Sequence, residues 1–191
     1  MPDIFPLGLS RDMAVHSLRS TIVDVPTARR HKLSNTSISA QSYVIVQVQL
    51  ENGAEGIGEA ATLGGPRWSE ESVEAIKANI DTCLAPALHG QRADLIEAAG
   101  LRMDQAAKRN NAAKAAIETA LWDAVGVAAH LQAFATLREL AWGCEHFGPR
   151  ILVGDLVTEP LQFEEFNIHL PTDPGIGVTL DADRMRAYAR T

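Results

Sequence analysis

The sequence predicts an α+β fold in which an antiparallel sheet of three strands is followed by helices. Three observations predict it. Extended apolar segments fill the first third of the chain, an Asn-Gly turn joins two of them, and helical periodicity begins near residue 70. Strands that come first and helices that come second are typical of this class.

The predicted strands form a meander. Residues 14–25 favour the first strand, which Pro26 is expected to end because proline lacks the N–H that a sheet ladder needs. Residues 37–50 alternate over a long stretch and predict the second strand. Asn52-Gly53 is a strong hairpin signal, so residues 54–61 are expected to return as the third strand.

Helices are expected in the rest of the chain. Ser69 is the predicted N-cap of the first helix and Asp181 that of the last, because short polar side chains accept hydrogen bonds from helix N-termini. The residues 150–153 (RILV) favour a short strand. The predicted helices cover residues 70–83, 93–107, 111–125, 131–141 and 182–189.

Composition limits the partners and the compartment. The chain has 191 residues, a net charge of −7 and a mean hydropathy near zero. An acidic protein is a poor general binder of nucleic acid or of an anionic membrane. No apolar run approaches the roughly 20 residues that span a bilayer, and no signal peptide is recognised. With only two cysteines, the chain is expected in the cytoplasm, with neither nucleic acid nor membrane as partner.

One segment resembles a family signature. Ala113–Gly126 (AKAAIETALWDAVG) is similar to the signature helix of the mandelate racemase and muconate lactonizing group of the enolase superfamily. Pro26–Ser34, Glu55–Trp68 and Glu71–Gln91 resemble muconate and chloromuconate cycloisomerases in the same order, and Leu137–Arg190 resembles that family's C-terminal end. The resemblance implies an N-terminal capping domain with a remnant of a (β/α) barrel.

The resemblance breaks after Gly126. Val127 follows Gly126 at the point where the family continues into its barrel. The sequence after Val127 resembles the region beyond the family's last barrel strand. A closed barrel takes about 250 residues, whereas only 65 residues follow Gly126. We therefore expect an in-frame internal deletion, with a capping domain at 1–126 and a barrel remnant at 127–191. A fault in the gene sequence is the alternative origin of the same junction.

The resemblance also implies a chemistry. The intact family converts cis,cis-muconate to muconolactone in aromatic catabolism, with Mn²⁺ or Mg²⁺ and a Lys-x-Lys pair. The only lysines here are Lys32, Lys77, Lys108 and Lys114, and no two are two residues apart. No catalytic residue, metal ligand or cofactor is therefore predicted for this chain, which is expected to be inactive.

Three acidic residues are candidates for a metal or catalytic role, and another role is favoured for each. Asp155 is the only loose candidate for a metal ligand, and a loop or capping role is favoured for it. Glu118 and Asp123 belong to the signature helix, where helix pairing and surface contacts are the favoured roles. The histidines show neither His-x-His nor HExxH spacing, so they indicate no metal site.

The resemblance assigns substrate contacts to two loops, Thr27–Ser34 and Thr62–Ser69. Leu63 and Trp68 are the predicted substrate-binding residues, although Trp68 could equally be a surface-packed aromatic. The cluster at residues 29–32 could attract a muconate-type dicarboxylate or simply be solvated. Self-association into a homo-oligomer is expected if apolar surface replaces the barrel. The alternative function is a non-catalytic interaction module that forms oligomers with full-length paralogues.

Overall fold

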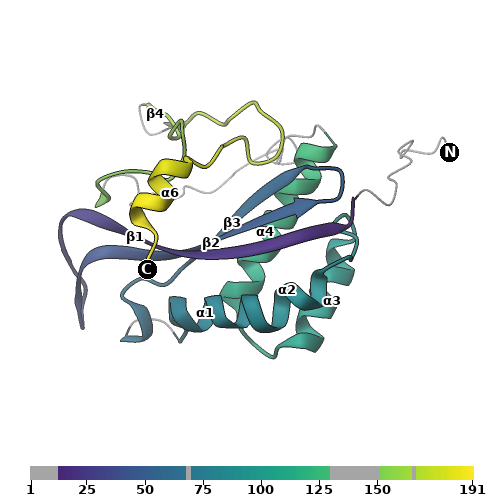
Figure 1. Cartoon of the computed structure of the whole chain (residues 1–191). Coiled ribbons are helices and arrows are strands. Elements are labelled where there is room, and N and C mark those ends of the chain that lie inside the picture. Colours follow the sequence, from purple (N-terminus) through teal and green to yellow (C-terminus); the bar gives the residue numbers. More distant parts are fainter. Residues whose placement is uncertain (1–12, 68–69, 130–150, 165–166) are drawn as a thin grey trace.

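The predicted meander is confirmed. The computed structural model describes residues 13–67, 70–129, 151–164 and 167–191. Strands β1 (Val15–Lys32), β2 (Ser37–Leu50) and β3 (Glu55–Ala61) form one antiparallel sheet in the order β1-β2-β3. The turn between β2 and β3 uses the predicted Asn52-Gly53 pair (Figure 1), because Asn52 Oδ1 accepts the N–H of Ala54 at 2.9 Å and Gly53 has φ of 85°.

The first strand does not end at Pro26, so that prediction is wrong. Pro26 lies opposite Ala40 within the ladder, and β1 continues to Lys32. Proline is tolerated here because β1 is an edge strand, whose outer side needs no ladder hydrogen bond. The carbonyl of Pro26 still accepts a bond, from the N–H of Val153 at 2.9 Å.

Helices cover one face of the sheet (Figure 1). Ser72, and not Ser69, caps the first of them, since its Oγ accepts the N–H of Ala75 at 3.2 Å. Ser69 and the predicted helix 131–141 lie outside the described residues. None of the described helices is both long and apolar enough to cross a membrane. The elements are α1 (Val73–Asn79), the π-helical η3 (Ile80–Leu84), α2 (Ala85–Leu88), α3 (Ile96–Ala106) and α4 (Asn111–Ala128).

Helix α4 packs closely on β3 because glycine leaves room for it. A Cβ placed on Gly58 would lie 2.0 Å from the carbonyl oxygen of Ala116, and one on Gly56 would lie 2.2 Å from that of Ala120. The two glycines alternate along β3 and therefore face the same side of the sheet. The main core forms at this contact, where Val44, Val46, Val48, Ile76, Ile80, Ile117 and Leu121 are buried.

The C-terminal segment covers the opposite face of the sheet. Val23 and Ile45 on that face are buried against Leu156 and Met185 and form a second, smaller core. Helix α6 (Ala182–Tyr188) lies across β1 and β2 (Figure 1). The apolar surface expected from a lost barrel is therefore partly occupied by this chain's own residues.

Some sequence predictions for this segment hold and others do not. Asp181 caps α6 as predicted, because its Oδ1 accepts the N–H groups of Asp183 and Arg184 at 2.9 and 3.0 Å. The predicted strand 150–153 is wrong in its described part, where Leu152 makes only an isolated bridge with Thr27. Two short strands were not predicted, β4 (Phe163–Glu164) and β5 (Asn167–Ile168), which pair with each other.

Asp123 ties the C-terminal segment to the helical layer. Its Oδ2 accepts the N–H of Ile57 at 2.8 Å and its Oδ1 accepts that of Ile176 at 2.6 Å. Of the two roles expected for Asp123, helix pairing and surface contacts, the surface contact is wrong because the side chain is buried, whereas Glu118 is exposed. Burial raises the pKa of this carboxyl, and the two backbone hydrogen bonds oppose that rise.

Arg190 makes a second link between the C-terminal segment and the rest of the fold. Its Nε and Nη2 donate to the two carboxylate oxygens of Asp24 at 2.7 and 2.6 Å, and it also pairs with Glu74. Its backbone N–H donates to the carbonyl of Ile22 at 2.9 Å. One side chain thus links the end of the C-terminal segment to β1 and α1.

Replacing Gly58 by Ala should destabilise the fold by about 3 kcal/mol, because the added methyl group meets the backbone of α4 rather than a movable side chain. Urea unfolding measures this. Gly100→Ala is the matched control, since nothing lies within 4 Å of its Cβ and it should stabilise α3 by about 0.5–1 kcal/mol. Equal effects of the two substitutions would contradict the close contact.

Arg190→Gln should lower stability at pH 7 by about 1 kcal/mol, and less as the pH falls. The hydrogen bond from Arg190 is the main cause that lowers the pKa of Asp24, so the pair's contribution is present above the unfolded pKa of about 3.9 and is lost as the pH falls through the folded value. Thermal melts between pH 3 and 7 measure it. Arg186→Gln, whose partner Asp183 is exposed, should change little at any pH.

Candidate functional site

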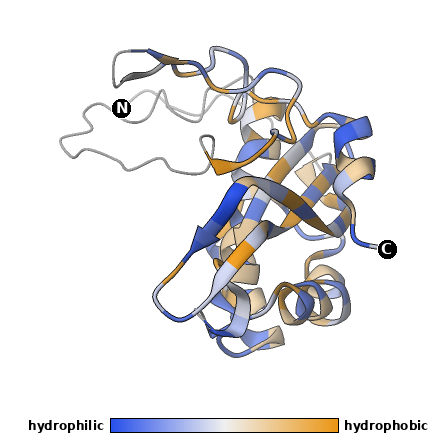
Figure 2. Ribbon diagram, turned by 90° about the vertical axis from the view of Figure 1, so that its left-hand side faces the viewer, coloured by the Kyte–Doolittle hydropathy of each residue, from blue (hydrophilic) through white to orange (hydrophobic). Residues whose placement is uncertain are grey.

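A polar hollow lies at the end of the sheet where β1 turns into β2. It encloses about 660 Å³ and reaches the 3₁₀ turn η2 (Gly65–Arg67). Figure 2 faces this end of the molecule and shows the hydrophilic tip of β1. We call this hollow the basic pocket; its lining residues are Arg30, Lys32, Leu33, Ser34, Asn35, Thr36, Ser37 and Arg67.

An irregularity in β1 positions the basic side chains. Pro26 pairs with Ala40 and His31 with Ile38, so β1 carries extra residues between these two pairs. Within this irregular stretch, just before the ladder resumes at His31, Arg30 Nε donates to Ser37 Oγ of β2 at 2.9 Å. This bond holds the guanidinium of Arg30 beside the mouth of the hairpin.

The two loops that the resemblance identified meet at this pocket. Asn35 Nδ2 donates to the carbonyl oxygen of Arg67 at 2.7 Å and so joins the β1–β2 turn to η2. The Leu33 N–H closes that turn on the Thr36 carbonyl at 2.8 Å. On the other side, Gly64 has φ of 71°, a left-handed conformation that glycine adopts without strain.

The charge of the pocket suits an anion. Three cationic side chains line it, Arg30, Lys32 and Arg67, and no carboxylate is among the described lining residues. Guanidinium groups bind carboxylates through two parallel hydrogen bonds, and an ammonium adds a point charge. The arrangement can hold a carboxylate or a similar oxyanion.

The sequence identified part of this pocket. In the basic cluster at residues 29–32, Arg30 and Lys32 line the hollow, whereas Arg29 and His31 do not. Leu63 is half-buried in the loop before η2 but is not part of the lining, and Trp68 lies outside the described residues. Asn35 and Arg67 were missed, because neither belongs to a pattern that the sequence displays.

The described residues do not assemble the acid–base chemistry of the superfamily. Lys77 Nζ is engaged by Asp81 Oδ2 at 2.8 Å and by the Ser20 carbonyl at 2.7 Å. Lys108 and Lys114 both bond to Asp104. Lys32 is therefore the one lysine of the chain that lies at the pocket.

The described residues also do not fit a divalent metal ion. Within them, no three His, Cys, Asp or Glu side chains converge on one point, whereas hard cations need several oxygen ligands. Asp155 instead caps its own loop, as favoured from the sequence, since its Oδ1 accepts the Leu156 N–H at 2.7 Å. No reaction step is assigned to a metal here.

Known proteins resemble this chain most clearly in its N-terminal part. The family described as "Mandelate racemase / muconate lactonizing enzyme, N-terminal domain" matches residues 17–135. Muconate cycloisomerase 1 of Pseudomonas putida is 52% identical over 104 residues, which cover 54% of this chain and 28% of that protein. Chloromuconate cycloisomerase of Delftia acidovorans is 49% identical over 111 residues, covering 58% and 30%. The chain thus spans about 30% of the length of these curated relatives.

Solved structures show a likeness of fold that reaches further along the chain. The muconate lactonizing enzyme of Pseudomonas fluorescens, solved with muconolactone, aligns with a TM-score of 0.87 at 20% identity, covering 94% of this chain and 100% of that one. The 2-chloromuconate cycloisomerase of Rhodococcus opacus gives a TM-score of 0.85 at 22% identity, covering 93% and 100%. The shared fold therefore extends beyond residues 17–135.

Asn35→Ala should loosen η2, because it removes the side-chain bond that joins the two loops. Hydrogen–deuterium exchange of the amides of Gly65 and Arg67 should accelerate severalfold, while global stability should fall by about 1 kcal/mol at most. Ser34→Ala, at the exposed neighbouring position, is the control and should leave exchange unchanged. Unchanged exchange in Asn35→Ala would show that the bond does not hold the loops together.

Proposed function

Because the chain belongs to the mandelate racemase / muconate lactonizing family, we propose that it is the substrate-capping part of a muconate-cycloisomerase-type protein. In this role the basic pocket binds one carboxylate of a muconate-type dicarboxylate. The observation that carries the proposal is the meeting of two loops, joined by Asn35 and Arg67, around three cations with no carboxylate among the described lining residues. Relatives named muconate and chloromuconate cycloisomerases support the choice of ligand.

The geometry of the pocket supports capture of one end of such a ligand. Arg30 and Arg67 come from the two different loops, so a carboxylate between them attracts both and draws the loops together. Leu63 and Trp68 are proposed to pack against the apolar carbon chain of the ligand. A cap that closes in this way excludes water from a bound substrate.

We propose that the chain captures this ligand without converting it. The superfamily's reaction needs a base and a metal-stabilised intermediate, and the lysine pair that would provide the base is absent from the sequence. An internal deletion at Gly126–Val127, between a capping domain at 1–126 and a barrel remnant at 127–191, accounts for that absence. The continuity of α4 across the junction is compatible with a deletion that left both flanks able to pack.

Titration with cis,cis-muconate tests the capping role. We expect weak, saturable shifts in NMR spectra of the full chain at residues 30–37 and 65–67, and binding about tenfold weaker in the double variant Arg30→Gln/Lys32→Gln, since two charge-assisted contacts are lost. Arg102→Gln, an exposed arginine on α3 outside the pocket, is the matched control and should bind normally. Absence of shifts at both loops would refute this role.

A separate assay tests the lack of turnover. The muconate absorbance should stay constant when the purified chain is incubated with substrate and Mn²⁺. An intact muconate cycloisomerase in the same buffer is the positive control. Turnover comparable with that control would refute the non-catalytic proposal and leave the binding result standing.

A further inference from the structure

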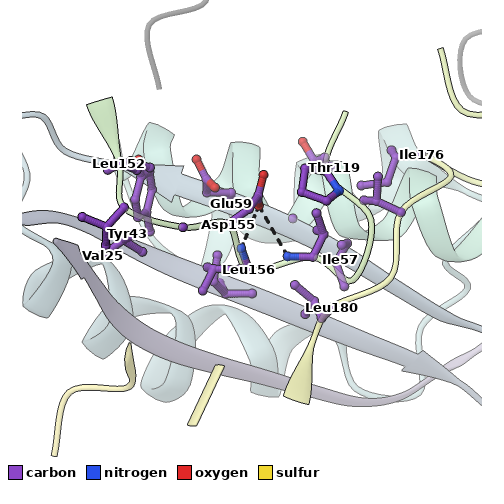
Figure 3. Close-up of a pocket in the computed structure, with 17 residues that line it drawn as sticks. Val25, Tyr43, Ile57, Glu59, Thr119, Leu152, Asp155, Leu156, Ile176 and Leu180 are labelled. Carbon is purple, nitrogen blue, oxygen red and sulfur yellow. Dashed lines mark hydrogen bonds between the residues drawn. The ribbon is translucent and has the colours of Figure 1, made fainter. Parts of the chain in front are cut away.

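A second hollow lies between the sheet and the C-terminal segment (Figure 3). It encloses about 570 Å³, within the range of about 300–1,000 Å³ that small-molecule sites occupy. None of its lining residues lines the basic pocket. We call it the sheet pocket; its apolar walls include Val25, Ile45, Leu156, Ile176, Val178 and Leu180.

The sheet pocket contains two carboxylates and no cation among its described lining residues. Glu59 comes from β3 and Asp155 from the C-terminal segment, and Figure 3 shows them side by side. Asp155 Oδ1 accepts the N–H groups of Leu156 and Val157 at 2.7 and 3.4 Å, which fixes its orientation. No ion pair with a described residue balances the charge of either acid.

The surroundings oppose the negative charge of Glu59. Its side chain lines the sheet pocket and is still exposed to solvent, and desolvation by the surrounding protein is the main cause that raises the pKa of its carboxyl. The negative charge of Asp155 raises it further. Burial, followed by the same two acids, raises the pKa of the Tyr43 hydroxyl that lies in the same wall. A cation bound between Glu59 and Asp155 would offset the repulsion between their negative charges.

We propose that the sheet pocket binds a small organic cation, a primary ammonium group carried on a compact apolar or aromatic body. The ammonium group lies between Glu59 and Asp155, where it gains two charge-assisted hydrogen bonds. The body of the ligand packs on the apolar walls beside the ring of Tyr43, which also favours a nearby cation. A dicarboxylate would be repelled by the same acids, so this site does not rest on the function proposed for the basic pocket.

Three probes with the same body and different charge test the site. The full chain is titrated with 2-phenylethylammonium, with neutral 2-phenylethanol and with anionic 3-phenylpropionate, and amide shifts are followed by NMR. The cation should produce saturable shifts at Tyr43, Glu59, Thr119 and Leu156 and should bind at least tenfold more tightly than the anion. Equal or tighter binding of 3-phenylpropionate would overturn the proposal, as would an absence of shifts at these residues.

A matched pair of variants tests the role of Glu59. Glu59→Gln keeps the shape of the side chain and should weaken 2-phenylethylammonium about fivefold, the effect of one ion pair. Glu55→Gln removes a carboxylate from the same strand outside the pocket, where Glu55 accepts a bond from Gln49 at 3.2 Å, and should leave the affinity unchanged. Equal weakening by the two variants would show a general charge effect and overturn the assignment. So would unchanged binding to Glu59→Gln.

Discussion

The two hydrogen bonds accepted by Asp123 connect the helical layer, the sheet and the C-terminal segment. They join α4 to β3 through Ile57 and to the C-terminal segment through Ile176. The carboxylate reaches both partners only because glycine stands at the points of contact. A Cβ on Gly56 would strike the α4 backbone, and one on Gly175 would lie 2.1 Å from Asp123 Oδ1. A buried acidic side chain, which ordinary patterning places outside, thus links the helical layer, the sheet and the C-terminal segment.

The strands were more predictable from the sequence than what covers them. Alternation along β2 correctly indicated two distinct faces, since Val46 faces the helices and Ile45 faces away. Nothing in the sequence indicated that Leu156 and Met185 cover the second face, because contacts between distant parts of the chain leave no periodic signal. The prediction of Ser69 as the N-cap was wrong for a local reason, since Ser72 also precedes helix-forming residues and the backbone geometry selects it.

The basic pocket shows how one wrong boundary conceals a site. Arg30 and Lys32 reach the pocket because β1 continues past Pro26 to Lys32, with Arg30 in the irregular stretch before the ladder resumes at His31. With the strand ended at Pro26, residues 29–32 could be predicted only as a basic cluster in a loop. Arg67 could not be assigned in any case, because its place at the pocket follows from the Asn35 bond and from the left-handed glycine that precedes it.

The C-terminal segment lines the sheet pocket and also contacts β1 at the residues that lead to the basic pocket. The Thr27–Leu152 bridge and the Val153–Pro26 bond hold the start of the β1 bulge, while Asp155 supplies half of the acidic pair a few residues later. The net charge of −7 does not indicate the local charge of either pocket. Charges in salt solution are screened beyond about 8–10 Å, so an anion near Arg30 responds mainly to the cations around it. The same screening would let one small acidic fold combine the anion site proposed for the basic pocket with the cation site proposed for the sheet pocket.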